Sequence, residues 1–93
     1  MAIIFEWDSP KALANRRKHG VSFEQALSVF RDPLARSMPD VVHSDLEMRQ
    51  VILGESGSPR RLLVVVFVER GDRYRIISAR LATKRERLDY EED

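Results

Sequence analysis

The chain has 93 residues, of which 43% are hydrophobic and 33% are charged, and its formal net charge is +1. This length allows one domain over residues 1–93 with a thin core, which excludes a deep cofactor cavity, and the lack of cysteine excludes disulfides, thiolate nucleophiles and cysteine-ligated zinc. The first residues lack the basic start of a signal peptide, and the longest apolar run, 62–68, is too short to cross a bilayer, so we expect a cytoplasmic protein with no membrane partner.

The N-terminal residues predict a strand followed by a helix. Residues that favour β-structure occupy Ala2–Trp7. Ser9 is typical of an N-cap, and Pro10 fits the first helical position, where its missing N–H has no intrahelical partner to lose. We expect this helix to run to about Lys18 and to end at Gly20, which readily adopts the left-handed conformation.

A second helix has the clearest pattern in the chain. Ser22 as N-cap and Gln25 three residues later predict a capping box. Apolar residues recur with the helical period and form one stripe: Phe23, Ala26, Leu27 and Phe30. Asp32-Pro33 ends the helix, since a residue before proline avoids the helical region. The stripe requires an apolar sheet surface to cover it.

The central part of the chain predicts a short edge strand and a hairpin. Residues 34–38 favour the edge strand, which we expect Pro39 to end. Two β-rich runs, 47–55 and 60–70, are separated by Ser-Gly-Ser-Pro, a sequence typical of a hairpin turn. Because 62–68 is apolar at every position, it predicts a central strand covered on both faces.

The C-terminal part predicts a third strand of the meander and a closing helix. Gly71-Asp72 is typical of a tight turn into a strand over 73–81. Strict alternation along this strand would place Tyr74, Ile76, Ser78 and Arg80 on one face and Arg73, Arg75, Ile77 and Ala79 on the other. Thr83 followed by Glu86 predicts a capping box for the last helix.

The order of these elements indicates an α+β fold. We expect an antiparallel meander packed against the two N-terminal helices, with a short C-terminal helix. The helices should lie mainly on one face of the sheet, because the second helix has to bury its stripe there. The other face is then left for binding.

Positive charge is concentrated in residues 60–87, which contain nine Arg or Lys and three acids, so this stretch carries 9 − 3 = +6. The six C-terminal residues carry −4, and we expect no other acidic patch to oppose the basic stretch. Such a surface can hold a phosphate backbone, although ordinary solvated arginines fit the same composition.

Arg80 and His43 are candidates for chemistry. Arg80 lies in an otherwise apolar strand, where a guanidinium is either an anion ligand or the ion-pair partner of Glu47, Glu69 or an acid of the C-terminal tail. His43 titrates near neutral pH and could move protons in RNA cleavage, although a single loop histidine is usually plain exposed surface. His19, at a helix end, has the simpler structural explanation.

The remaining side chains do not suggest a metal or cofactor site. The two histidines lack the spacing of metal ligands, and no glycine-rich phosphate loop is present, so we expect neither a metal nor a cofactor. Arginines with one or two titratable groups suit metal-independent transfer of an RNA phosphodiester, in which the arginines stabilise the charged phosphorane. The same inventory suits RNA binding without catalysis equally well.

Five short motifs occur in order over almost the whole chain, from about Ile3 to Glu92. They are Phe5-Glu6-Trp7-Asp8, Asn15-x-x-Lys18-His19-Gly20-Val21-Ser22-Phe23, Phe30-x-Asp32-Pro33, His43-Ser44-x-x-Glu47-x-Arg49 and Ile76-Ile77-Ser78-Ala79-Arg80-x-Ala82-Thr83-x-x-Glu86-Arg87-x-x-Tyr90-Glu91. With these motifs the chain resembles the BrnT family of toxins.

This resemblance implies a RelE-like fold and the toxin half of a bacterial type II toxin–antitoxin pair, an endoribonuclease that inhibits translation and growth. It also implies an antitoxin, BrnA, with a ribbon-helix-helix domain through which the complex contacts DNA. The candidate catalytic residues are Arg80, His43, Arg49 and Glu47. The candidate RNA-binding residues are Arg73, Arg75, Lys84, Arg87 and Tyr90. The alternative is a non-catalytic RNA-binding or regulatory module.

Overall fold

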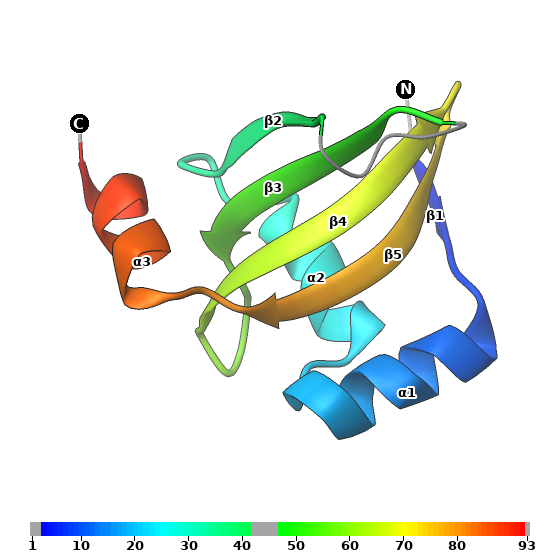
Figure 1. Ribbon diagram of the computed structural model, residues 1–93, viewed down its shortest axis with the longest axis horizontal. Helices are drawn as coiled ribbons and strands as arrows, with labels where there is room; N and C mark the ends of the chain where they lie inside the picture. The colour runs from blue at the N-terminus through cyan, green and yellow to red at the C-terminus, as the bar shows by residue number, and fades with distance from the viewer. Residues whose placement is uncertain (1–2, 42–46, 93) are drawn as a thin grey trace.

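A five-stranded sheet in the order β1-β5-β4-β3-β2 forms the centre of the protein (Figure 1). The computed structural model describes residues 3–41 and 47–92. Along the chain the elements are β1 (Ile4–Glu6), α1 (Ser9–His19), α2 (Phe23–Val29), β2 (Arg36–Asp40), β3 (Arg49–Glu55), β4 (Leu62–Arg70), β5 (Arg73–Leu81) and α3 (Lys84–Glu91). Strands β2 to β5 are antiparallel neighbours, as the predicted meander requires, and β1 adds to β5 in parallel. The predicted α+β fold is confirmed.

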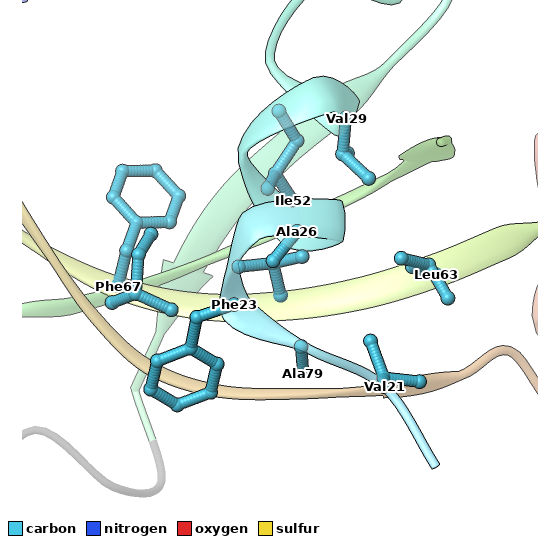
Figure 2. Packing of buried hydrophobic residues seen from close by; sticks show 10 residues of the cluster. Val21, Phe23, Ala26, Val29, Ile52, Leu63, Phe67 and Ala79 are labelled. Atoms are coloured by element: carbon cyan, nitrogen blue, oxygen red, sulfur yellow. The ribbon is translucent and has the colours of Figure 1, made fainter. Parts of the chain in front are cut away.

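Helices α1 and α2 pack on one face of the sheet (Figure 1), and the main core lies between α2 and the sheet (Figure 2). Phe23, Ala26 and Val29 of α2 are buried in this core. Their partners from the sheet are Ile52, Leu63, Val65, Phe67, Ile76 and Ala79. The remaining stripe residues, Leu27 and Phe30, are partly buried against the same cluster. Strand β4 therefore directs Leu63, Val65 and Phe67 toward the second helix.

Helix α3 covers one end of the opposite face, over a second and smaller core. Leu53, Leu62 and Val64 are buried there, and Tyr90 of α3 packs against them. The hydroxyl of Tyr90 donates a hydrogen bond of 2.5 Å to Asp32 Oδ2. Only the part of this face that α3 leaves uncovered is available for a ligand.

Asp32 joins three parts of the chain, a role that the helix-ending signal of Asp32-Pro33 did not predict. Its carboxylate accepts hydrogen bonds from the backbone N–H groups of Leu34 (2.9 Å) and Glu55 (2.8 Å), besides the hydroxyl of Tyr90. Burial acts to raise the pKa of Asp32, but these hydrogen bonds outweigh it and lower the pKa below its usual range. Asp32 is therefore held ionised as a structural acceptor.

The caps of α1 and α2 differ in part from the prediction. Asp8, not Ser9, is the N-cap of α1, because its carboxylate accepts from the Lys11 N–H (3.2 Å) while Ser9 is already helical. Gly20 ends this helix with φ of 70°, as predicted. Ser22 accepts from the Gln25 N–H (3.1 Å), which confirms half of the predicted capping box.

The prediction was wrong for the other half of the capping box, the hydrogen bond from the Ser22 N–H to the side chain of Gln25. The side-chain amide of Gln25 donates instead to the carbonyl of Pro59 (3.1 Å) and accepts from Arg61, both beyond the end of β3. These groups lie next to α2 only in the folded chain, so the local sequence does not reveal that they compete for the amide. In contrast, both hydrogen bonds of the capping box at Thr83 and Glu86 are present.

Strand boundaries shift by about two residues where local turns intervene. β2 begins at Arg36, not at Leu34, because the Asp32 turn includes the hydrogen bond from the Ala35 N–H to the Asp32 carbonyl (3.1 Å). Pro39 lies inside this strand and does not end it, which an edge strand tolerates because one side of its backbone pairs with no other strand in the described part of the chain. The predicted edge position of the strand is confirmed.

A β-bulge in β5 overturns the predicted alternation of its side chains. Val66 is opposite Ser78, but the next residue, Phe67, is opposite Ile76, so Ile77 is an extra residue. A bulge of this kind reverses the alternation for the rest of the strand. The residues facing α1 and α2 are Tyr74, Ile76 and Ala79. Ser78 and Arg80 therefore share the opposite face with Arg75.

The side chain of Asn15 pairs with the outer edge of β5 where β1 ends. β1 pairs only with Arg73, Tyr74 and Arg75. Further along β5, Asn15 Nδ2 donates to the Ala79 carbonyl (2.8 Å) and Asn15 Oδ1 accepts from the Ala79 N–H (3.1 Å). Nδ2 also donates to the carbonyl of Val21 (3.0 Å). This buried amide fixes α1 against the sheet.

Replacing Phe30 by alanine should lower the free energy of unfolding by about 3–5 kcal/mol. The Phe30 ring lies 4.9 Å from the rings of both Phe5 and Phe67 and 5.8 Å from that of Tyr74, so the change leaves a cavity between α2 and the sheet. Urea denaturation measures the loss, with Leu34→Ala as control because Leu34 is 68% exposed. Equal denaturation midpoints for the two variants would contradict this packing.

Candidate functional site

A groove on the face opposite α1 and α2 brings together residues of four strands and α3. Its volume is about 410 Å³. The groove is lined by Asp40, Arg49, Val51, Val64, Val66, Ser78, Arg80 and Glu86. Valines form an apolar part of the lining, while two arginines, one serine and two acids provide the polar groups. Two predicted catalytic residues, Arg49 and Arg80, therefore meet in one groove.

Strand register explains why these side chains share the groove. Val64 lies opposite Arg80 on the neighbouring strand, and the bulge sets Ser78 opposite Val66. On the other side of β4, Val51 lies opposite Val66, and Asp40 lies opposite Arg49 at the start of β3. Sequence reasoning did not select Ser78 or Asp40 for the site, since their contribution depends on cross-strand register.

Arg80 forms a two-pronged ion pair with Glu86. Its Nη1 lies 2.8 Å from Glu86 Oε1, and its Nη2 lies 2.9 Å from Glu86 Oε2. Glu86 Oε1 also accepts from the Thr83 N–H (2.8 Å), as the capping box requires. The hydrogen bonds from Arg80 lower the pKa of Glu86 to about 2, and the same contact raises the pKa of Arg80. The proposed partners of Arg80, namely Glu47, Glu69 or a tail acid, were wrong.

Acids from other parts of the chain also lie beside the basic stretch. Glu6 of β1 is 3.5 Å from Arg73 and 3.0 Å from Arg75. Arg60 pairs with Glu55. Single glutamates outside the C-terminal tail therefore offset part of the basic charge locally, because the sheet places them next to these arginines.

Glu47 does not line the groove. Glu47 Oε2 accepts from Arg70 Nε (2.7 Å) and Oε1 from Arg70 Nη2 (2.6 Å), at the end of β4. This contact with Arg70 lowers the pKa of Glu47. His43 lies outside the described residues, so its role stays a prediction from the sequence.

The predicted RNA-binding residues of α3 do not line the groove either. Lys84 and Arg87 are exposed, and Lys84 borders a separate hollow that includes Leu88. Tyr90 has a structural role through its packing and its bond to Asp32; burial and this bond raise the pKa of Tyr90 to about 12.

Within residues 3–41 and 47–92, no three His, Asp or Glu side chains are grouped closely enough to hold a metal ion. No helix in the described part of the chain has the length and apolar character needed to cross a membrane.

The Arg80–Glu86 pair should make stability depend on acid pH. Because the folded protein lowers the pKa of Glu86 from 4.5 to about 2, the stabilisation is present above the usual value and disappears as the pH falls toward 2. Solvent screens this partly exposed pair, so we expect it to contribute on the order of 1 kcal/mol. In urea denaturation, wild type should exceed Glu86→Gln in stability at neutral pH, and the difference should vanish near pH 2. A difference that stays constant over this range would contradict the ion pair.

Comparison with known proteins identifies the chain's family. The family described as "Ribonuclease toxin, BrnT, of type II toxin-antitoxin system" matches residues 7–86. This match covers most of the 93 residues, including Arg49, Arg80 and Glu86. No curated protein matches the chain. The matched region confirms the resemblance found in the sequence motifs, and membership implies a cognate antitoxin. The chain therefore belongs to the BrnT family and is a ribonuclease toxin of a type II toxin–antitoxin system.

Proposed function

We propose that the groove between β2, β3, β4, β5 and α3 is the RNA-cleaving site of this toxin. The observation that carries the proposal is that Arg49 and Arg80, which come from different strands, line the same groove next to the hydroxyl of Ser78. Arg80 is 39% exposed at its side chain, so an RNA phosphate can reach it. Guanidinium groups bind phosphate oxygens in two-pronged geometry, which suits this position.

The reaction that fits these groups is an internal phosphoryl transfer. The 2′-oxygen of the RNA attacks the adjacent phosphorus, and the bond from phosphorus to the 5′-oxygen breaks, leaving a cyclic phosphate. Negative charge develops on the phosphate oxygens in the transition state, where Arg80 and Arg49 stabilise it. Because the substrate supplies the nucleophile and arginines supply the positive charge, the proposed reaction is endonucleolytic and independent of metal.

Proton transfer requires a group other than Glu86. A carboxyl with a pKa of about 2 that is already bound to Arg80 is a weak base at neutral pH. We assign this role to His43 on the sequence argument alone: it takes the proton of the 2′-hydroxyl or supplies one to the 5′-oxygen. His43→Gln should abolish the part of the pH–rate profile that titrates near neutrality.

The rest of the open face offers a path for RNA beside the groove. Arg75 and Arg73 lie on this face along β5, and Glu6 holds both. Glu6 offsets one of their two positive charges, so these arginines are suited to short-range hydrogen bonds with the RNA backbone more than to long-range attraction. Lys84 and Arg87 on the exposed surface of α3 are further candidates for phosphate contacts.

We further propose that the cognate antitoxin is BrnA-like, with a ribbon-helix-helix domain, and that the toxin contacts DNA only through it. Family membership supports this pairing. The toxin then acts on cytoplasmic RNA and stops translation and growth. Expression in a growing bacterium tests the pairing: growth arrest should be relieved by the neighbouring reading frame and not by an unrelated one.

Arg80→Ala should reduce RNA cleavage by roughly 10²–10³-fold, the usual effect of losing one donor that stabilises transition-state charge. Arg80→Lys should recover only part of the rate, since it keeps the charge but loses the two-pronged geometry. Arg49→Ala should also reduce the rate. The measurement is kcat/KM on a defined RNA, normalised to the folded fraction. Arg60→Ala is the matched control, because it removes the same charge from an exposed ion pair outside the groove. Normal cleavage by folded Arg80→Ala would exclude this groove as the active site.

Cleavage should continue in EDTA. The proposed chemistry takes its positive charge from Arg80 and Arg49, so removing divalent ions leaves the transition state stabilised. The assay compares purified toxin before and after chelation, with a metal-dependent ribonuclease as control. Loss of cleavage in EDTA with recovery on addition of magnesium or manganese would overturn the mechanism.

A further inference from the structure

We infer that Glu86 is a positioning residue for RNA cleavage, which orients the guanidinium of Arg80 toward the phosphate. This inference rests on the proposed function of Arg80 and assigns a role to the acid beside it. Glu86 itself neither donates a hydrogen bond to the substrate nor takes a proton from it.

The orientation follows from which nitrogen atoms Glu86 occupies. A guanidinium has five N–H donors, arranged as an end fork between Nη1 and Nη2 and a side fork between Nε and Nη2. Glu86 takes the end fork with both of its oxygens, at 2.8 and 2.9 Å. The second hydrogen of Nη1 is directed to the Leu81 carbonyl (3.2 Å). Within the described part of the chain, no contact uses the side fork, which leaves two parallel donors for an oxyanion.

Glu86 is a rigid support for this arrangement. Its Oε1 accepts from the Thr83 N–H (2.8 Å), and its own N–H donates to Thr83 Oγ1 (3.2 Å). The carboxylate is thus fixed to the first turn of α3 by the capping box. Its side chain is 28% exposed, against 39% for Arg80, so the arginine is the more accessible member of the pair. The first turn of α3 therefore fixes the plane of the Arg80 guanidinium, and the edge of the guanidinium that Glu86 does not contact is exposed to solvent.

A purely structural pair would behave differently. If the contact only joined β5 to α3, its loss would lower stability, and activity would fall only with the folded fraction. If Glu86 orients Arg80, its loss lowers kcat in the folded protein as well, because a misplaced catalytic group costs rate even when substrate still binds. The two cases separate in a comparison of kcat with KM and in chemical rescue.

The first experiment compares Glu86→Gln with Arg36→Ala. Glu86→Gln should lower kcat by about 10- to 100-fold with little change in KM. Arg36→Ala removes the hydrogen bond from Arg36 to the Glu92 carbonyl at the other end of α3 and leaves the ion pair intact, so it should loosen the helix and keep kcat. An equal fall in kcat for the two variants would overturn the inference, because any loosening of α3 would then suffice.

The second experiment uses guanidinium ion as a probe. Arg80→Ala leaves a space beside Glu86 that guanidinium from solution can fill, so guanidinium chloride below denaturing concentrations should restore part of kcat with saturation. Arg80→Ala combined with Glu86→Gln should show no such rescue, since the carboxylate that orients the ion is gone. Urea and ammonium chloride at the same concentrations control for denaturant and for charge without a fork.

The outcomes also separate this inference from the proposed function. Equal rescue of the single and double variants would overturn the positioning role of Glu86 while the catalytic role of Arg80 stands. Full activity of Arg80→Ala without guanidinium would overturn both.

Discussion

The bulge in β5 is the constraint on which the groove depends. Without the extra residue Ile77, strict alternation would turn Arg80 toward α1 and α2, into the layer where Ala79 is fully buried. A guanidinium there would be buried without an acid, which costs several kcal/mol. With the bulge, a small residue faces the core and the arginine faces the open side. Strand β5 thus contributes Ala79 to the core and Arg80 to the groove, at the expense of one unpaired residue.

Charge on this protein is organised in local pairs more than in a continuous positive surface. Three glutamates lie beside four of the arginines: Glu47 beside Arg70, Glu6 beside both Arg73 and Arg75, and Glu86 beside Arg80. Such pairs reduce the long-range field and leave short-range hydrogen bonds as the means of recognition. Helix α3 is attached to the rest of the protein at both ends, through Glu86 at its start and Tyr90 near its end. The groove and the helix therefore form together.

Local signals in the sequence predicted local structure well. Gly20 and Thr83 marked helix boundaries correctly, and the strand over 73–81 has the predicted bounds. Errors arose where two groups could fill the same role. Asp8 was overlooked beside Ser9 because both residue types cap helices, and the amide of Gln25 found partners in a distant loop. Strand β1 has only three residues, too few to predict its parallel partner.

Of the candidate site, the sequence predicted its arginines but not their surroundings. Arg49 and Arg80 were selected by residue type and motif, which need no knowledge of register. That Ser78 and Arg80 lie on the open face, where Arg80 meets Glu86, depends on a bulge that no local pattern indicates.

The side-chain amide of Asn15 protects an exposed edge of the sheet against aggregation with other copies of the protein. Beyond Arg75, no strand among residues 3–41 and 47–92 pairs with the outer edge of β5, and an edge of this kind can recruit a strand from another chain and begin aggregation. Asn15 carries a donor and an acceptor in the geometry of a peptide group and satisfies both backbone groups of Ala79. One side chain on a helix thus takes the place of a strand. At the opposite edge of the sheet, Pro39 has no N–H to donate from β2. Each edge of the sheet therefore carries a residue that hinders pairing with a strand from another chain.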